Sequence, residues 1–299
     1  MKILITGSNG QLGTELYKIL REGISELGKI PESLQDSIVF ATDVDELDIT
    51  DIKAVEKFFS KNKPDIVFNC AAMTNVDGCE RDEEIAYRIN AEGPKNLATI
   101  SQCYGARLIH ISTDYVFFGD GTIPYNESDT TNPNTVYGRS KLAGEQFVLN
   151  LCANSCVCRT AWLYGYVGNN FVKTMLRLAR EKGTLTVVND QVGNPTSAVD
   201  LAYQLVLLAA SQEMGIFHCT CNGEPVSWYT FAKRVVEKAK LDVSVNACTT
   251  EQFPRPAKRP AFSALDNRNL RETIGDNMRK WEEALDSFLE SYLEREGMS

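Results

Sequence analysis

Short apolar runs alternate with longer segments of helical periodicity along the first half of the chain. Runs rich in β-branched and other apolar residues predict buried strands. These runs are residues 2–6, 38–41, 65–69, 107–112 and 157–162. Elsewhere apolar side chains recur every three or four positions, which predicts helices with one buried face. These segments are residues 11–20, 52–59, 86–103 and 137–149. Strands that alternate with helices build βαβ units, so the pattern predicts an α/β fold with a Rossmann-type doubly wound parallel sheet.

The alternation loosens beyond about residue 165. Three prolines, Pro254, Pro256 and Pro260, mark an extended loop in this part. The remaining periodic segments predict a strand at 184–188 and helices at 170–181, 199–210, 227–239 and 280–293. We therefore expect a domain at 1–166, to which a segment of roughly 197–220 returns. A smaller α/β C-terminal lobe should occupy 167–299.

Charge and cysteine content narrow the range of partners. The net charge of −9 repels phosphate backbones, so we expect no nucleic acid polymer as a partner. The nine Cys lack the spacing of a disulfide framework or a zinc site, which indicates free thiols in a reducing compartment. No apolar run reaches the length of a membrane span, and the N-terminal run is too short for a secretory signal. We expect a cytoplasmic protein that does not contact a membrane.

A glycine-rich turn follows the first predicted strand and opens the first predicted helix. Its glycines, Gly7, Gly10 and Gly13, are spaced GxxGxxG rather than GxGxxG. A tight turn, close approach of a pyrophosphate and close packing of helix on strand all favour a residue without Cβ. The helix N-terminus adds free N–H groups and a positive dipole end. The turn therefore predicts a dinucleotide site.

Asp43 follows the second predicted strand, where a carboxylate can bind the adenosine ribose. A carboxylate there favours a free 2′-hydroxyl, and hence NADH, although Lys and Arg elsewhere leave NADPH open. Asp43 lies further from the glycines than is usual, so residues 23–37 must form a longer connection. Asp48 and Ile49 come slightly later, where a polar and an apolar side chain can flank the adenine.

Tyr137 and Lys141 stand four positions apart on a predicted helix and therefore share one face. A phenol has a pKa near 10, and a neighbouring ammonium that stabilises the phenolate lowers it. Such a pair can exchange protons with a substrate. Thr113 follows the strand at 107–112, at the edge of the sheet where ligands bind, and can stabilise charge on a carbonyl oxygen. These three residues are the predicted catalytic group.

The glycine turn, the strand-end hydroxyl and the Tyr–Lys helix together resemble the extended short-chain dehydrogenases/reductases. Within that group the chain resembles the dTDP-4-dehydrorhamnose reductase family over nearly its whole length. The blocks that carry the resemblance are residues 69–80, 112–117, 159–165, 168–179, 189–196 and 259–263. The departures are small: Cys70 replaces a usual Ala, Met73 stands where an aromatic or His is frequent, and Phe118–Gly119 replaces Pro-Gly.

The resemblance implies NAD(P)H-dependent reduction of the 4-keto group of dTDP-6-deoxy-L-lyxo-4-hexulose to dTDP-L-rhamnose, for polysaccharide biosynthesis. It implies that Tyr137 donates the proton, that Lys141 holds the nicotinamide ribose, and that Trp162 packs on the sugar held by Thr113 and Asp114. It also implies that the cofactor contacts Gly10, Gln11, Leu12, Asp48, Ile49, Ala71, Ala72 and Met73. Some members use Mg²⁺ at a dimer contact, and Glu15 stands at a matching place. Both Mg²⁺ and a homodimer are left open at this point.

Several of these residues also have simpler interpretations. Trp162 can be a core residue, and Asp114 can cap the following turn. Arg259, next to Lys258, can form part of a solvated pair or can hold the nucleotide diphosphate. His110 and His218 lie in apolar runs and are expected to be structural.

Two other functions remain open from the sequence. One is a nucleotide-sugar epimerase or dehydratase of the same fold, which would retain its cofactor and return the hydride. The other is a regulatory subunit that resembles the beta subunit of methionine adenosyltransferase. The presence of Thr113, Tyr137 and Lys141 favours the reductase.

Overall fold

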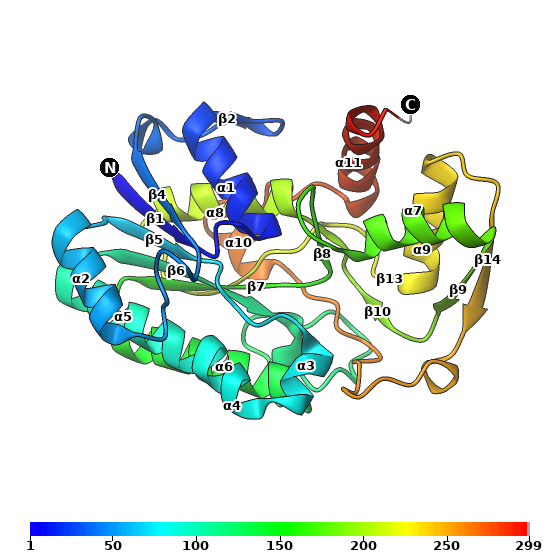
Figure 1. The fold of residues 1–299 in the computed structure, drawn as a ribbon, viewed down its shortest axis with the longest axis horizontal. Helices are drawn as coiled ribbons and strands as arrows, with labels where there is room; N and C mark the ends of the chain where they lie inside the picture. Colours follow the sequence, from blue (N-terminus) through cyan, green and yellow to red (C-terminus); the bar gives the residue numbers. More distant parts are fainter. Residues whose placement is uncertain (298–299) are drawn as a thin grey trace.

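A parallel sheet of six strands forms the centre of the protein, whose computed structural model describes residues 1–297 (Figure 1). The strands lie in the order β12-β7-β6-β5-β1-β4. Their bounds are β1 (Lys2–Thr6), β4 (Ile38–Thr42), β5 (Ile66–Asn69), β6 (Arg107–Thr113), β7 (Ser155–Thr160) and β12 (Gly215–His218). The chain leaves β1 towards β4 on one side and returns to β5 on the other, which creates a switch point between β1 and β5. The predicted doubly wound sheet is confirmed.

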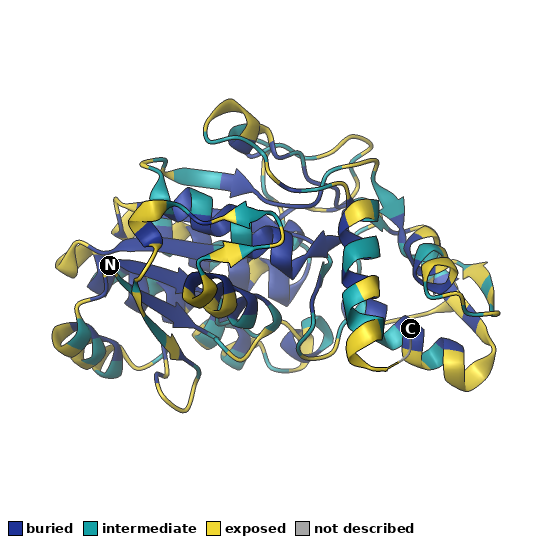
Figure 2. Cartoon of the chain, turned by 90° about the horizontal axis from the view of Figure 1, so that it is seen from above, coloured by how far each residue is buried: buried dark blue, intermediate teal, exposed yellow. Residues whose placement is uncertain are grey.

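Helices cover both faces of the sheet, because alternate side chains of each strand point to opposite faces. On one face Leu4 packs with apolar residues of α2 (Ile52–Asn62) and α5 (Gly93–Tyr104), beside α6 (Val136–Leu151). On the other face Ile3 and Ile5 pack with α1 (Gln11–Glu22) and α8 (Ala198–Ala210). Figure 2 shows that burial is concentrated in these layers and exposure in the outer turns.

The single helix predicted at 86–103 is divided in the structure. It consists of α4 (Glu83–Tyr87), a π-helical segment (Arg88–Glu92) and α5. Asn90 lies in the π-helical segment, a feature that often marks a functional site. A Cβ at Gly144 would collide with the Asn90 carbonyl oxygen, so the glycine lets α6 pack closely on this segment.

The last predicted strand of the first half, 157–162, is displaced. The strand β7 begins and ends two residues earlier, at Ser155 and Thr160. Trp162 lies beyond its end with a φ of 48°, in the left-handed region that large side chains rarely adopt. A strand could not continue through this conformation.

A smaller group of elements lies beside the sheet, on the right of Figure 1. In the second half of the chain the four predicted helices and the strand at 184–188 are confirmed, whereas β14, which pairs with β9, was not predicted. The elements of the second half are β8 (Leu163–Tyr164), α7 (Phe171–Lys182), β9 (Thr184–Val188), β10 (Val192–Gly193), β11 (Thr196–Ser197), β13 (Val226–Ser227), α9 (Trp228–Lys238), β14 (Ser244–Cys248), α10 (Arg268–Glu272) and α11 (Trp281–Arg295). The remaining elements of the first half are β2 (Ile24–Ser25), β3 (Gly28–Lys29) and α3 (Val76–Arg81), with β2 and β3 inside the longer connection predicted at 23–37.

The segment predicted to return to the first domain is in contact with it. Within this segment, α8 packs on α1, and β12 pairs with β7 at the edge of the main sheet. We propose on this basis that 1–166 with about 197–220 forms a cofactor-binding half and that the rest of 167–299 forms the substrate lobe. Residues 298 and 299 of that lobe lie outside the described residues.

The structure also bears on what the sequence predicted for the cysteines and the two histidines. All nine Cys are free, and most of them are buried. The side chains of His110 and His218 are fully buried, on β6 and β12. Within residues 1–297, no helix combines the length and the apolar character needed to cross a membrane.

Candidate active site

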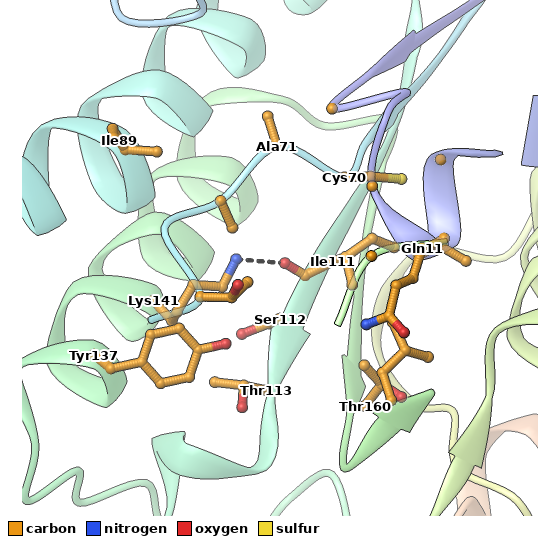
Figure 3. Close-up of a pocket in the computed structure, with 18 of the residues that line it drawn as sticks. Gln11, Cys70, Ala71, Ile89, Ile111, Ser112, Thr113, Tyr137, Lys141 and Thr160 are labelled. Atoms are coloured by element: carbon orange, nitrogen blue, oxygen red, sulfur yellow. Dashed lines mark hydrogen bonds between the residues drawn. The ribbon is translucent and has the colours of Figure 1, made fainter. Parts of the chain in front are cut away.

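A cavity of about 730 Å³ opens at the carboxyl ends of the strands beside the switch point (Figure 3). Most residues singled out in the sequence line it. They are Gly7, Gly10, Gln11, Leu12, Gly13, Asp43, Asp48, Ile49, Ala71, Ala72, Thr113, Asp114, Tyr137, Lys141 and Trp162. Met73 and Arg259 are not among its lining residues. The fold thus brings together residues that are far apart in the sequence.

The glycine turn leaves space that any side chain would fill. Gly7 has a φ of 65°, and a Cβ there would lie 2.7 Å from the backbone nitrogen of Ala71. A Cβ at Gly13 would collide with the carbonyl oxygen of Gly7. Gly10 precedes α1, and no side chain caps the first turn of this helix. The free N–H groups and the close backbone approach fit a pyrophosphate.

Asp43 helps to hold this turn in place. Its Oδ2 accepts a hydrogen bond of 3.1 Å from the Asn9 backbone N–H, and its Oδ1 accepts one of 2.9 Å from Val44. Each carboxylate oxygen has a further lone pair, so the side chain can still accept a hydroxyl. Asp43 therefore links the turn to the place where an adenosine ribose would lie.

Asp48 and Ile49 are held by local contacts. Asp48 Oδ1 accepts hydrogen bonds from the backbone N–H and the hydroxyl of Thr50, at 2.9 and 2.8 Å. Asn96 donates to the Ile49 carbonyl oxygen at 3.0 Å, and Gly93 leaves room for the Ile49 side chain. The two residues form a fixed wall at this end of the cavity.

Tyr137 and Lys141 lie side by side on α6 and face the end of β6 (Figure 3). Lys141 Nζ donates a hydrogen bond of 2.6 Å to the Ile111 carbonyl oxygen. Burial raises the pKa of Tyr137, and the Thr113 hydroxyl opposes this rise. The sequence argument predicted a net lowering of the Tyr137 pKa by Lys141, but the net shift is upward, because burial outweighs any stabilisation of the phenolate and the ammonium donates its hydrogen bond to the backbone.

Thr113, and not Asp114, caps the turn that follows β6. The Thr113 hydroxyl accepts from the Tyr115 backbone N–H at 3.3 Å and donates to Asp114 Oδ1 at 2.9 Å. Asp114 is buried, and burial raises the pKa of its carboxyl group to about 6. Within residues 1–297 its Oδ2 forms no hydrogen bond of standard geometry, although the Ser263 hydroxyl lies close enough to oppose the rise in the pKa of Asp114. This buried oxygen lies at the cavity and is suited to a hydroxyl donor.

A buried ion pair between Glu145 and Arg159 lies close to Lys141 and was not predicted. Glu145 follows one turn later on the same helix, and its carboxylate binds the Arg159 guanidinium through bonds of 2.9 and 2.7 Å. Both side chains are at most 3% exposed. Burial lowers the pKa of Lys141 to about 8, and the Glu145 carboxylate opposes this shift. The spacing of Glu145 from Lys141 along the helix could have been noticed in the sequence. Its pairing with Arg159 on β7 could not, because that contact depends on the fold.

Two predicted residues do not line the cavity and are engaged with other residues. Met73 is held by Asn90, which accepts from its N–H at 2.8 Å and donates to its carbonyl oxygen at 3.1 Å. Arg259 forms an ion pair of 3.1 Å with Asp77 on α3. Of the two residues considered as a solvated pair, Arg259 is instead partly buried and paired with Asp77, whereas Lys258 is exposed and lies over the Phe118 ring.

The residues described give no support to a bound Mg²⁺ ion. Glu15 is buried on α1, and burial raises the pKa of its carboxyl group. Within residues 1–297 no group of three or more His, Cys, Asp or Glu side chains could hold a metal. We therefore assign no metal to this chain.

Comparisons with known proteins agree with the geometry of the cavity. The family model described as the RmlD substrate binding domain matches residues 1–294. The spore coat polysaccharide biosynthesis protein SpsK of Bacillus subtilis is 41% identical over 289 residues, with 97% of each chain covered.

Two solved structures are similar over nearly their whole length. A dTDP-4-dehydrorhamnose reductase of Clostridium acetobutylicum is 49% identical with a TM-score of 0.92, and the match covers 97% of this chain and 99% of that chain. The dTDP-4-dehydrorhamnose reductase of Bacillus anthracis, solved in complex with NADP, is 40% identical with a TM-score of 0.90 and the same coverage. The chain therefore belongs to the RmlD family, the dTDP-4-dehydrorhamnose reductases of the extended short-chain dehydrogenase/reductase type.

Proposed function

We propose that this protein uses NAD(P)H to reduce the 4-keto group of dTDP-6-deoxy-L-lyxo-4-hexulose, which gives dTDP-L-rhamnose. The observation that carries the proposal is the position of Thr113, Tyr137 and Lys141 in one cavity with the glycine turn. Family membership and the names of the two similar reductases support it. The presence of this set also favours an enzyme over a regulatory subunit.

Each group at the reacting end of the cavity would have its own role in the reduction. The bound nicotinamide supplies the hydride. The hydroxyls of Thr113 and Tyr137 hold the carbonyl oxygen of the sugar, and the Tyr137 phenol gives that oxygen its proton. Because burial raises the pKa of Tyr137, the phenol is protonated before reaction, as a proton donor must be. Lys141 holds the ribose next to the nicotinamide and stabilises the phenolate that remains.

The cofactor would lie along the cavity from the glycine turn to Tyr137. Its pyrophosphate binds the first turn of α1, where Gly7, Gly10, Gln11, Leu12 and Gly13 leave free N–H groups and space. Asp43 binds the adenosine ribose and favours NADH. Lys141 is the one cationic residue that lines the cavity within residues 1–297, so no side chain there compensates a 2′-phosphate. The Bacillus anthracis relative was solved with NADP, which favours NADPH, so both cofactors must be compared.

The sugar nucleotide would enter at the opposite end, towards the smaller lobe. Asp114 offers a buried carboxylate oxygen to a sugar hydroxyl, and Trp162 offers an apolar wall. Arg259 would reach the diphosphate by exchanging Asp77 for it, since an anion competes for the same guanidinium.

Replacing Tyr137 by Phe tests the assignment of the proton donor. The variant keeps the ring and loses the hydroxyl, so kcat should fall by about 10²–10⁴-fold. The Kd for NADPH, measured by fluorescence titration, should stay within about threefold, because the phenol is not expected to contribute much to the affinity for NADPH. Turnover near that of the unmodified protein would contradict the assignment.

A further inference from the structure

Two tryptophans stack on each other at the wall of the cavity. The ring centroids of Trp162 and Trp228 are 3.5 Å apart, and their planes differ by 7°. Both residues line the cavity. Trp162 follows β7 of the main sheet, whereas Trp228 is the first residue of α9 in the smaller lobe. The stack therefore joins the two halves of the molecule at the site itself.

The Trp162 backbone is held in a strained conformation. Its φ of 48° lies in the left-handed region, which a residue with a Cβ adopts only at a cost in free energy. Strain of this kind persists where the surroundings enforce it, and it is concentrated at functional sites. A Cβ at Gly193 would lie 2.8 Å from Cε2 of the Trp162 ring, so the absence of a side chain there leaves room for the ring. The position of the indole is fixed by Gly193 and Trp228 together.

Trp228 is itself held firmly by the smaller lobe. Its ring centroid lies 4.4 Å from that of Phe171, at the start of α7. Ser227 caps α9 by accepting a hydrogen bond of 3.1 Å from the Thr230 N–H, which fixes the first turn of the helix. The backbone N–H of Trp228 donates to the Gln191 carbonyl oxygen at 3.4 Å. Trp228 is therefore partly buried and is positioned by contacts with Phe171 and Gln191.

The stack lies at the reacting end of the cavity. Thr113 and Thr160 are direct neighbours across β6 and β7, and Trp162 follows Thr160 by two residues. Asp43 and Asp48 mark the opposite, adenosine end. The aromatic wall is therefore close to the hydroxyls that would hold the sugar carbonyl.

We propose that Trp228 is a specificity-determining residue that fixes Trp162 and completes an aromatic wall for the reacting sugar ring. The inference rests on the proposed function. The C–H face and the methyl group of a 6-deoxyhexose are apolar, and an aromatic wall binds such a surface while excluding water. The wall should distinguish a nucleotide that carries a hexose from the nucleoside diphosphate alone.

Calorimetry with dTDP-glucose and with dTDP tests this proposal without any turnover. Trp228→Ala should weaken dTDP-glucose binding by about tenfold, the scale of one aromatic contact, and change dTDP binding by less than twofold. Trp228→Phe should weaken dTDP-glucose binding by less than Trp228→Ala does. Trp281→Phe, the third Trp of the chain and buried in the smaller lobe, is the matched control and should bind both ligands normally. Equal losses for dTDP-glucose and dTDP, or no loss, would overturn the proposal.

Circular dichroism in the far ultraviolet, where the strong indole transition lies, tests the stack directly. Two indoles in contact couple, so the unmodified protein and Trp281→Phe should show an exciton signal that Trp228→Phe lacks. A signal that persists in Trp228→Phe would contradict the stack. Failure of the unmodified protein to reduce the keto sugar would instead overturn the proposed function and leave these results interpretable.

Discussion

The Lys141 amine is subject to two opposing influences. Burial lowers its pKa to about 8, and the Glu145 carboxylate and the Cys70 thiol oppose this shift. His110 is also close, but burial holds its pKa well below the usual value, so it carries no charge near neutrality. The charged form of Lys141 is lost as the pH rises through its pKa. Activity that depends on the ammonium should therefore decline above about pH 8.

Replacing Glu145 by Gln should move this decline to lower pH. The substitution removes the carboxylate that favours the ammonium, so the pKa of Lys141 falls further, by roughly one unit. The measurement is kcat/KM for the keto sugar between pH 6 and pH 10, which reports the pKa values of the form that binds the sugar. Glu92→Gln is the control, because Glu92 pairs with Lys95 on the surface at 2.9 Å. An alkaline limb that is the same in Glu145→Gln and the unmodified protein would refute this role.

At the scale of single elements, the glycine turn depends on space as well as on conformation. Gly7 and Gly105 have similar φ angles of 65° and 72°. A Cβ at Gly7 meets the backbone of Ala71, whereas a Cβ at Gly105 meets nothing within 4 Å. The two positions therefore separate the cost of a left-handed backbone from the cost of a collision.

Substituting Ala at each position tests this difference. Gly105→Ala should lower stability by about 1–2 kcal/mol and leave NADPH binding unchanged. Gly7→Ala should have a larger effect on stability and weaken NADPH at least tenfold, because β1, the turn and β5 must move apart. Urea unfolding and fluorescence titration measure the two effects. Equal consequences at the two positions would show that the contact with Ala71 is unimportant.

The sequence predicted most elements of the first half because their signals are local. Periodicity located β1, β4, β5, β6, α1, α2 and α6 to within a few residues, but it joined α4, the π-helical segment and α5 into one helix and missed α3. The displaced end of β7 could not be found in this way, since Trp162 is apolar and reads as part of a strand. The left-handed backbone occurs where the Trp162 ring lies against Gly193 and Trp228, which are distant in the sequence.

The same distinction applies to the site. The glycine turn, Thr113 and the pair of Tyr137 and Lys141 were predicted, because each has a pattern of its own. Glu145 and its partner Arg159 were missed, since their contact joins a helix to a strand. The pKa of Tyr137 was predicted in the wrong direction, because burial cannot be judged from spacing alone.

At the scale of the whole molecule, Arg279 forms two partly buried ion pairs that link the two proposed halves. Arg279, just before α11, binds Asp200 on α8 and Glu26 in the β2–β3 hairpin, each at 2.6 Å. The Asp200 side chain is fully buried, so loss of its partner would leave a charge without compensation. Such a loss costs far more than breaking an exposed pair.

Replacing Arg279 by Met should therefore lower the free energy of unfolding by about 3–5 kcal/mol. Arg177→Met, which breaks a pair with Glu181 whose side chains are 60% and 49% exposed, should cost less than about 1 kcal/mol. Urea unfolding followed by circular dichroism measures both. Losses of similar size would mean that the Arg279 contact does not hold the halves together.

The central claim is that the two halves meet around a site for NAD(P)H and a keto sugar nucleotide. The most direct measurement is absorbance at ~340 nm with the purified protein, NADH or NADPH, and enzymatically generated dTDP-6-deoxy-L-lyxo-4-hexulose. We predict a decrease in absorbance that requires the keto sugar, with NADH at least as effective as NADPH if, as proposed, Asp43 binds the adenosine ribose. No decrease with either cofactor, from folded protein that still binds the dinucleotide, would contradict the account.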